Sequence, residues 1–267
     1  MKKSHYLTRE KQIYFVGAGP GNVELLTIAG FQAIKKAQIV FYDALIDEKG
    51  FRKINPSATW LYVGKRSNQL STNQKLINRL IVSYLERGLQ IVRLKGGDPT
   101  IFGRLSEEIS ELKKKNIPFS VIPGVSAASA AAADLELSLT KREISRSVSF
   151  VTPAVSKNSE KTENWAEIVK TSETSVIYMG GKTLKYISST LLENGLRPTT
   201  PVAIVESASL ESKKQITSLA KLVTIDTQSF KGPVCIIIGK VIEDVSTNSM
   251  SNLESSLDLK RLAFNAA

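Results

Sequence analysis

The sequence predicts an α/β protein, and three observations support this prediction. Runs rich in β-branched and aromatic residues alternate with amphipathic segments of helical period. Glycine-rich turns follow several of these runs, and the hydrophobic fraction of 42% with a charged fraction of 23% is ordinary for a folded protein. Strand and helix in alternation are typical of a mostly parallel sheet covered by helices, so we expect this architecture.

The first half of the chain contains the clearest alternation. We expect strands at 13–17, 38–43, 89–94 and 117–124, and helices at 23–37, 73–88 and 104–116. The first helix would bury one face made of Val23, Leu26, Ile28, Phe31 and Ile34. The second would bury Leu76, Ile77, Leu80, Ile81 and Leu85, and would end at Gly88 in a left-handed cap. The third carries many charges and reads as a surface helix.

The alternation of expected strands and helices begins again near Ser126, so we expect a second domain. A helix of small residues at 126–134 precedes expected strands at 147–152, 174–180, 201–207 and 232–242, with helices at 163–170 and 183–195. We divide the chain into an N-terminal α/β domain at 11–124 and a C-terminal α/β domain at 125–245. Residues 246–267 are rich in Ser and Asn, and we expect a loosely ordered tail.

Composition excludes several classes of function. The only histidine is His5, so a histidine triad or a zinc site with several histidines has almost no residues to use. The only cysteine, Cys235, stands in the apolar run VCIII and is expected to be a buried, inert thiol. The chain start lacks the pattern of a signal peptide and no apolar run reaches the ~18 residues of a membrane helix, which predicts a cytoplasmic protein.

The charge of the chain indicates an anionic partner without naming it. Lys and Arg outnumber Asp and Glu by 36 to 25, for a net charge of +11. Nucleic acid, membrane lipid and a small polycarboxylate are all compatible with this excess. A dense basic and aromatic stripe, which would favour a nucleic-acid-binding protein, is missing from the sequence.

The turn GAGPG after the first expected strand is similar to a dinucleotide fingerprint. That fingerprint needs a glycine at position 22, where this chain has Asn22, and Pro20 brings no amide hydrogen for a pyrophosphate. Asp43, at the end of the second expected strand, could imitate the ribose-binding acid of the same fold. A nucleotide-dependent oxidoreductase therefore remains an alternative at this point.

The stretch LKGGDPTIFGR is the second motif. Its two glycines allow the backbone to approach a ligand closely, and Asp98 can bind hydroxyl or amine groups. The alternative is an ordinary strand-to-helix turn in which Asp98 caps a helix.

A series of motifs in fixed order resolves these alternatives. The stretches VGAGPG, YDALI, VGKR, IVRLKGGDPTIFGR, IPFSVIPGVSAASAAAA, LTKRE, SVSFVT, IYMG and VAIVE extend from Ile13 to Ile242. Together they resemble the uroporphyrinogen-III C-methyltransferases, a family of tetrapyrrole methylases that also forms the methylase part of siroheme synthase.

The resemblance implies a fold and a reaction. It implies two α/β domains of the tetrapyrrole methylase type, a homodimer, and S-adenosyl-L-methionine held in the cleft between the domains. It further implies transfer of two methyl groups to ring carbons of uroporphyrinogen III, giving precorrin-2 for siroheme or cobalamin biosynthesis. No metal, nucleic acid or membrane is required. A methylase of the same fold that acts on another tetrapyrrole or corrin intermediate is the alternative.

The resemblance also assigns residues motif by motif. Asp43 and Lys65 fall on the proposed acid and base positions, and Arg104, Glu107 and Arg142 on the tetrapyrrole side. The positions that contact the methyl donor are Pro20, Gly96, Gly97, Asp98, Ile101, Ser126, Ala127, Met179 and Ala208. A sulfonium methyl donor is already activated, so the protein must chiefly align the reacting atoms and exclude water.

This chain departs from the family pattern on the tetrapyrrole side. Histidine is usual where Leu70 and Lys141 stand, and glycines are usual where Leu105 and Ser106 stand. The pair Pro153 and Ala154 replaces a common Gly-His. The motifs of the donor side are kept, so we expect a divergent enzyme that still binds the same donor.

Overall fold

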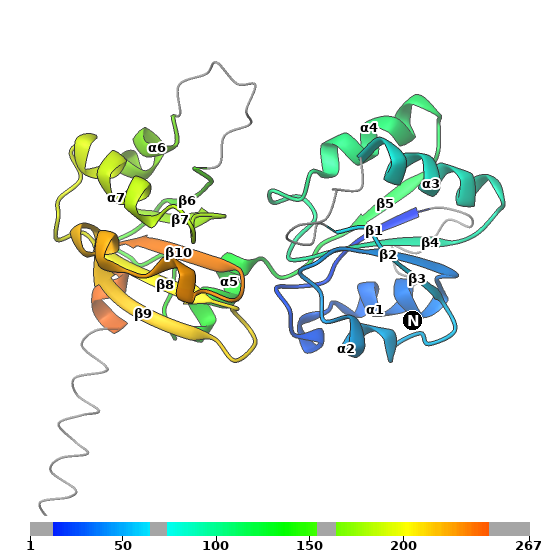
Figure 1. The fold of residues 1–267 in the computed structure, drawn as a ribbon, viewed down its shortest axis with the longest axis horizontal. Helices are drawn as coiled ribbons and strands as arrows, with labels where there is room; N and C mark the ends of the chain where they lie inside the picture. The colour runs from blue at the N-terminus through cyan, green and yellow to red at the C-terminus, as the bar shows by residue number, and fades with distance from the viewer. Residues whose placement is uncertain (1–12, 65–73, 154–163, 246–267) are drawn as a thin grey trace, which may run out of the picture. The chain divides into compact units, whose positions relative to one another are not determined.

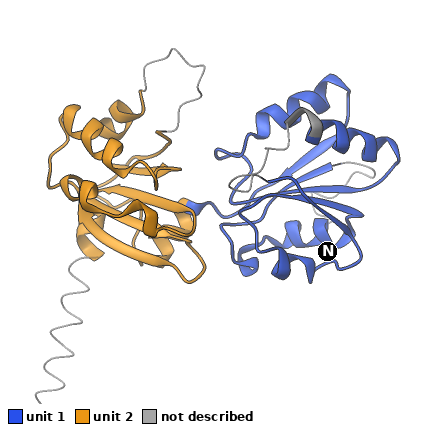
Figure 2. Cartoon of the chain, in the orientation of Figure 1, with its two compact units in different colours: residues 1–127 blue, residues 128–267 orange. Residues whose placement is uncertain are grey.

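The computed structural model describes residues 13–64, 74–153 and 164–245. The chain divides into two compact units, residues 1–127 and 128–267 (Figure 2), and each unit contains one five-stranded sheet. The predicted α/β class is confirmed, whereas the assignment of domains to 11–124 and 125–245 stays a prediction. None of the helices in the described ranges has both the length and the apolarity that a membrane span requires.

Unit 1 contains a parallel sheet with the strand order β3-β2-β4-β1-β5 (Figure 1). Helices α1 and α2 lie on one face of this sheet and α3 and α4 on the other. The strands are β1 (Ile13–Gly17), β2 (Ile39–Tyr42), β3 (Thr59–Tyr62), β4 (Ile91–Lys95) and β5 (Phe119–Ile122), and the helices are α1 (Ile28–Lys36), α2 (Glu48–Arg52), α3 (Gln74–Glu86) and α4 (Leu105–Lys114). The sequence had not predicted β3 or α2.

The first expected helix is divided into two helices in the structure. A short 3-10 helix, Val23–Leu25, is followed by extended backbone at Leu26, and α1 then begins after Thr27. The Thr27 hydroxyl oxygen caps α1 by accepting the amide hydrogen of Gly30 at 3.1 Å. The break changes the phase of the helix, so the expected buried face is wrong at Ile28, which is 84% exposed, and at Phe31.

The predictions for the second and third helices of unit 1 are confirmed in part. Ile77 and Ile81 are buried on α3, whereas Leu80 is 36% exposed, and Gly88 has the predicted left-handed backbone with φ +77°. Helix α4 is amphipathic rather than wholly solvated, because Glu108 and Leu112 are buried beneath it.

Successive side chains along the strands of unit 1 point to opposite faces of the sheet, so the unit has two hydrophobic cores, one on each face. Val16, Val40 and Leu94 belong to the cluster with α1, and Phe15 and Phe41 belong to the cluster with α3 and α4. Strands buried on both faces are typical of parallel sheets.

Unit 2 differs from the mostly parallel sheet that we expected. Its strand order is β6-β7-β10-β8-β9, and only β6 and β7 are parallel. The segment 207–212 between β8 and β9 is too short for a parallel crossover, so these strands form an antiparallel pair. The strands are β6 (Val148–Val151), β7 (Thr174–Tyr178), β8 (Pro201–Glu206), β9 (Lys213–Ser218) and β10 (Val234–Gly239). The edge strand β9 had not been predicted, because its side chains are mostly exposed and polar.

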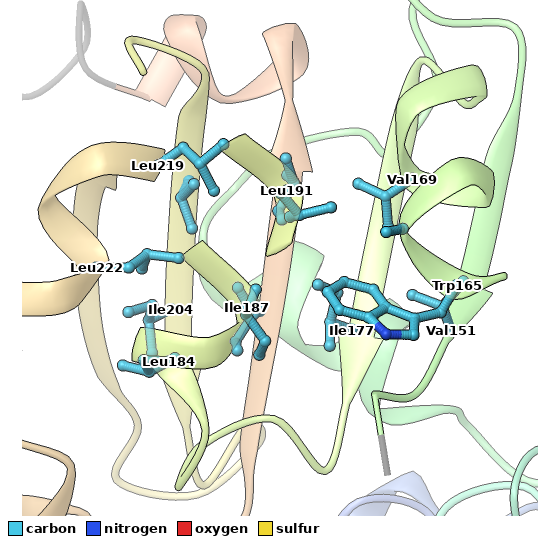
Figure 3. Close-up of a cluster of buried hydrophobic side chains, with 14 residues drawn as sticks. Val151, Trp165, Val169, Ile177, Leu184, Ile187, Leu191, Ile204, Leu219 and Leu222 are labelled. Atoms are coloured by element: carbon cyan, nitrogen blue, oxygen red, sulfur yellow. The ribbon is translucent and has the colours of Figure 1, made fainter. Parts of the chain in front are cut away.

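Helices α6 and α7 cover one face of the second sheet (Figure 1), and their apolar side chains form the core shown in Figure 3. Trp165 and Val169 on α6, with Ile187 and Leu191 on α7, pack against strand residues such as Ile177. The helices are α5 (Ala127–Asp134), α6 (Trp165–Thr171) and α7 (Leu184–Glu193), with 3-10 helices at Leu219–Thr224, Thr227–Ser229 and Lys240–Ile242.

The single cysteine lies in the second sheet, as predicted. Cys235 on β10 is 3% exposed, and burial raises the pKa of its thiol to about 12. The interpretation of Cys235 as a buried core residue is confirmed, and a protonated, buried thiol is a poor nucleophile.

Candidate functional site

Most of the predicted site residues of unit 1 follow the carboxyl ends of its strands. Strands β1, β2, β4 and β5 are parallel, so the loops after them emerge at one edge of the sheet. These loops carry Pro20, Asp43, the segment Gly96-Gly97-Asp98, and Ser126. Topology alone therefore brings together residues that are far apart in the sequence.

The two glycine motifs are hydrogen-bonded to each other. The Gly97 amide donates to the Gly19 carbonyl at 2.7 Å, the Gly19 amide donates to the Gly97 carbonyl at 3.3 Å, and the Ala18 amide donates to the Lys95 carbonyl at 2.8 Å. The amides of Ala18 and Gly19 are thus already used by the backbone and are not available to a pyrophosphate. Pro20 follows directly and has no amide hydrogen.

Glycine is required where these loops approach each other. A Cβ on Gly17 would lie 2.5 Å from the Gly124 nitrogen, and a Cβ on Gly124 would lie 2.4 Å from the Gly97 carbonyl oxygen. A Cβ on Gly97 would meet none of the described atoms within 4 Å, and its φ is +69°. The glycine loops are therefore closely packed on one side and open at Gly97.

Asp98 connects two of the loops. Its Oδ1 accepts the amide hydrogen of Thr100 at 2.8 Å, and its Oδ2 accepts the amide hydrogen of Gly124 at 3.0 Å. Helix α4 begins only at Leu105, so the alternative of Asp98 as a helix cap is wrong. Asp98 and Gly124 hold the loop after β4 against the loop after β5.

Asp43 lies beside a buried cluster of charged side chains that the sequence did not predict. The Arg93 side chain is 6% exposed, and its Nε is 3.2 Å from Glu108 Oε1. Lys95 Nζ is 3.0 Å from Glu108 Oε2, with both side chains nearly inaccessible. Arg93 Nη2 lies 3.8 Å from Asp43 Oδ2, and the Asp43 side chain is 24% exposed. The signal was present in β4, where two cations at alternate positions interrupt an otherwise apolar strand.

Burial affects the ionisation of this cluster. Removal from water lowers the pKa of Lys95, and the positive charge of Arg93 lowers it further, while Glu108 opposes both effects. Buried charges are tolerated when they are paired and hydrogen-bonded, and Glu108 provides this pairing for both cations.

Two residues assigned to the tetrapyrrole side pair with each other at the start of α4. Arg104 Nε lies 2.8 Å from Glu107 Oε1 and Arg104 Nη2 lies 2.5 Å from Glu107 Oε2. The hydrogen bond from Arg104 lowers the pKa of Glu107. Both side chains are about half exposed, and Arg104 has a left-handed φ of +54°. A polar ligand could therefore reach this fork-shaped pair from solvent.

Two donor-side residues of unit 2 follow strands that run in the same direction. Strands β7 and β8 are both antiparallel to β10, so Met179 after β7 and Ala208 after β8 emerge at one edge of the second sheet. Met179 and the neighbours of Ala208, Ser207 and Ser209, all have positive φ. Strained backbone of this kind is concentrated at functional sites in proteins.

Glu206 ends β8 directly before the loop that carries Ala208 and holds the loop that precedes β10, and sequence reasoning missed it. Its nearly inaccessible carboxylate accepts amide hydrogens from Lys231 and from Gly232, the latter at 2.6 Å, and lies 3.9 Å from Lys213 Nζ. Hydrogen bonding from the Gly232 amide is the main cause of a pKa of Glu206 below its ordinary value.

Arg142 lies in a basic cavity of unit 2. The cavity has a volume of about 480 Å³ and is lined by Thr140, Lys141, Arg142, Glu143, Ser145 and Arg146. Lys141 is paired with Asp244, whose carboxylate lies 2.6 Å from Nζ. Within the described ranges, Arg142 and Arg146 form no ion pair, so both guanidinium groups are available to an anion.

Some predicted residues fall outside the described ranges. Lys65, Leu70, Ala154 and the tail 246–267 belong to this group. The other site residues divide between the two units, so the cleft between domains stays a prediction.

Comparison with known proteins supports one family. The family model described as Tetrapyrrole (Corrin/Porphyrin) Methylases matches residues 12–223. The chain is 36% identical over 233 residues to uroporphyrinogen-III C-methyltransferase of Bacillus subtilis (strain 168), covering 86% of this chain and 91% of that protein. It is 38% identical to siroheme synthase of Saccharophagus degradans over 86% of this chain, but spans only 51% of that longer protein.

Solved structures agree with this result. A uroporphyrin-III C-methyltransferase from Thermus thermophilus complexed with S-adenosylhomocysteine superposes with a TM-score of 0.74 at 31% identity, covering 87% of this chain and 99% of that one. A cobalt precorrin-4 methyltransferase superposes with a TM-score of 0.77 at 24% identity, covering 87% and 96% respectively, which shows the shared fold.

Proposed function

The chain belongs to the tetrapyrrole methylase family, and from this membership we propose that it transfers methyl groups from S-adenosyl-L-methionine to two ring carbons of uroporphyrinogen III, giving precorrin-2. The relative from Bacillus subtilis, which the chain matches over nearly its whole length, supports this choice of substrate. The siroheme synthase of Saccharophagus degradans supports it for the half of its length that this chain spans.

The observation that carries the proposal is the backbone bridge between Gly19 and Gly97. It closes the GAGPG turn against the GGDP loop and, with the hydrogen bond from Ala18 to Lys95, leaves the amides of Ala18 and Gly19 unavailable to a pyrophosphate. A nucleotide-dependent oxidoreductase is therefore disfavoured by geometry as well as by Asn22. The same bridge joins two of the motifs that the family resemblance assigns to the methyl donor.

The open side of this bridge fits the methyl donor. Gly97 presents backbone without a side chain to space that is free of described atoms, while Gly17, Gly124 and Asp98 fix the loops behind it. We assign donor contacts to Pro20, Gly96, Gly97, Asp98, Ile101, Ser126 and Ala127 in unit 1, and to Met179 and Ala208 in unit 2. The donor supplies an activated methyl group, so these residues need only bind it, orient it and exclude water.

Asp43 is proposed as the proton acceptor. A proton must leave the macrocycle after a ring carbon has been methylated, and a fixed carboxylate can take it. Asp43 Oδ1 accepts the Leu45 amide hydrogen at 3.3 Å, and Oδ2 faces Arg93. The carboxylate is thereby oriented and remains partly accessible. Lys65, the other acid-base residue that the resemblance assigns, lies outside the described residues.

The cations of the site suit a substrate with eight carboxylates. Arg142 and Arg146 line the basic cavity without ion pairs among the described residues, and Arg104 stands half exposed at the start of α4. We assign Arg104, Glu107 and Arg142 to the tetrapyrrole. This gives part of the net charge of +11 a specific partner.

The cellular context is also proposed from the family. We propose a cytoplasmic homodimer whose product is used for siroheme or cobalamin. The siroheme synthase of Saccharophagus degradans supports the first pathway. Light scattering after gel filtration would test the dimer, and a monomer at working concentration would contradict it.

The decisive experiment is turnover with a defined substrate. The purified protein is incubated with S-adenosyl-L-methionine and enzymatically generated uroporphyrinogen III, and the product is analysed by mass spectrometry. A dimethylated tetrapyrrole is expected. Binding of S-adenosylhomocysteine without methylation of this substrate would contradict the substrate assignment, and a screen of other tetrapyrroles would then test the alternative.

A matched pair of variants tests the role of Asp43. Asp43→Asn removes the proton acceptor and should reduce kcat by about 100-fold or more. Asp47→Asn makes the same chemical change at an exposed position of the same loop and should leave kcat unchanged. Equal activity of the two variants would contradict the assignment.

A further inference from the structure

The buried charges around Arg93 are arranged to hold Asp43. Arg93 and Lys95 are two residues apart on β4, so both side chains point to the same face of the sheet. That face is covered by α4, from which Glu108 reaches both cations. The cluster is thus built from the central strand of unit 1 and one helix, which are rigid elements.

The charge of this cluster is not balanced by Glu108 alone. Two cationic side chains share one buried carboxylate, which leaves an excess of positive charge when Lys95 carries its proton. Uncompensated charge in a protein interior is costly, so a second carboxylate near the cluster is favoured. Asp43 supplies it, with Oδ2 at 3.8 Å from Arg93 Nη2.

The guanidinium of Arg93 is itself fixed from three sides. Its Nε contacts Glu108, its Nη1 donates to the Leu94 carbonyl at 2.9 Å, and its Nη2 faces Asp43. Because two partners fix the planar guanidinium group, its remaining nitrogen, Nη2, points in one direction only. Because 3.8 Å is too long for a hydrogen bond, Arg93 attracts the Asp43 oxygen without using its lone pairs.

Gly96 allows this approach. A Cβ at Gly96 would lie 2.8 Å from the Leu45 Cβ and 3.7 Å from Asp43 Oδ1. The loop after β2 therefore packs directly on the end of β4, which brings Asp43 within range of Arg93.

We propose that Arg93, oriented by Glu108, is a positioning residue that holds the Asp43 carboxylate in the geometry needed to accept a proton from the methylated macrocycle. The inference rests on the proposed function, because it assigns to Asp43 the role of proton acceptor. Arg93 acts through Asp43 and is not expected to touch the substrate.

The test is a double-mutant cycle with Arg93→Met and Asp43→Asn. Arg93→Met leaves Glu108 paired with Lys95 at 3.0 Å, so it does not strand a buried carboxylate. We expect Arg93→Met to reduce kcat by about 10-fold to 100-fold, with the Kd for S-adenosylhomocysteine within about 3-fold of wild type. In the Asp43→Asn background the same substitution should change kcat by less than about 2-fold.

Two further variants serve as controls. Lys114→Met removes the exposed Lys114–Glu111 pair from α4 and should leave both kcat and Kd unchanged. If Arg93→Met fails to fold, Arg93→Lys replaces it in the test. This substitution keeps the positive charge but removes the planar guanidinium group. We expect kcat to fall about 5-fold or more while the affinity for the donor is unchanged.

The outcomes separate this inference from the proposed function. Equal loss of kcat from Arg93→Met in both backgrounds, or no loss at all, would overturn the positioning role. Full activity of Asp43→Asn would also overturn it, while leaving methyl transfer intact. If the wild type methylates no tetrapyrrole, the proposed function fails. The Tm values of the wild type, the two single variants and the double variant still test whether Arg93 and Asp43 interact. Arg93→Met should lower Tm less when Asp43 is already replaced, and an equal decrease would refute the pairing.

Discussion

Gly97 and Gly88 have closely similar backbones, with φ of +69° and +77°, and in neither case would a Cβ meet a described atom within 4 Å. The two glycines belong to different parts of unit 1. Gly97 belongs to the bridge with Gly19, whereas Gly88 terminates α3. They form a natural pair for separating backbone strain from ligand binding.

Alanine at either glycine should reduce stability by a similar amount, about 1 kcal/mol, because an L-residue is strained at positive φ. Only Gly97→Ala should weaken binding of S-adenosylhomocysteine, by about 10-fold or more, since its methyl group would enter the space assigned to the donor. Urea unfolding and calorimetric titration measure the two effects. Equal donor affinity in the two variants would show that the donor does not lie against Gly97.

Arg142 and its neighbour Lys141 should differ in their contribution to substrate binding. Arg142→Ala should raise the KM for uroporphyrinogen III about 10-fold, because the basic cavity loses a guanidinium that has no ion pair among the described residues. Lys141→Ala should raise it less, because Lys141 is already paired with Asp244. Steady-state kinetics at low and high salt would check both. A larger effect of Lys141→Ala would reassign the contact.

Glu206 should make unit 2 sensitive to acid. Its pKa in the folded protein lies below the ordinary value of 4.5, so its stabilising effect is complete above that pH and is lost as the pH falls through the folded pKa. Glu206→Gln should therefore cost about 1.5 kcal/mol of unfolding free energy at pH 7, and the difference from wild type should shrink in acid.

Urea unfolding followed by circular dichroism between pH 7 and acid measures this difference. Glu211→Gln, at an exposed position in the loop after β8, should leave the pH dependence unchanged. A difference for Glu206→Gln that stays constant with pH would show that its carboxylate charge is not what stabilises the loop before β10.

Cys235 should report on unfolding. It is the only cysteine of the chain, and burial raises the pKa of its thiol to about 12. Labelling by a thiol reagent at pH 8 should therefore be far slower in the native protein than in urea. Rapid labelling of the native protein would mean that β10 opens readily or lies less deep than the structure has it.

The sequence predicted the fold of unit 1 better than that of unit 2. Buried apolar strands such as β1 and β4 and long amphipathic helices such as α3 carry strong periodic signals. The orientation of β10 carries no such signal, because an apolar strand reads the same in a parallel or an antiparallel sheet. Strand β9 has little apolar periodicity, because most of its side chains are exposed. Its pairing with β8 depends on backbone hydrogen bonds, which leave no pattern in the sequence.

Prediction of the site had a similar limit. The glycine motifs were visible because close approach of loops demands specific residue types, as at Gly17 and Gly124. Glu108 was read as part of a charged surface helix, because the sequence did not reveal that this turn of α4 faces two cations on β4. Long-range pairing of charges appears only when topology places the strand and the helix together.

The edge strand β9 has a consequence for solubility. An edge strand exposes unpaired backbone groups that can recruit another chain and start aggregation. In β9 this edge begins with two lysines, of which Lys213 lies 3.9 Å from Glu206 and Lys214 donates to the Asp134 carbonyl at 2.8 Å. Adding another strand here would place it against these two lysines and disturb both contacts. The residues that fasten β9 to unit 2 thus also protect the protein against intermolecular sheet growth.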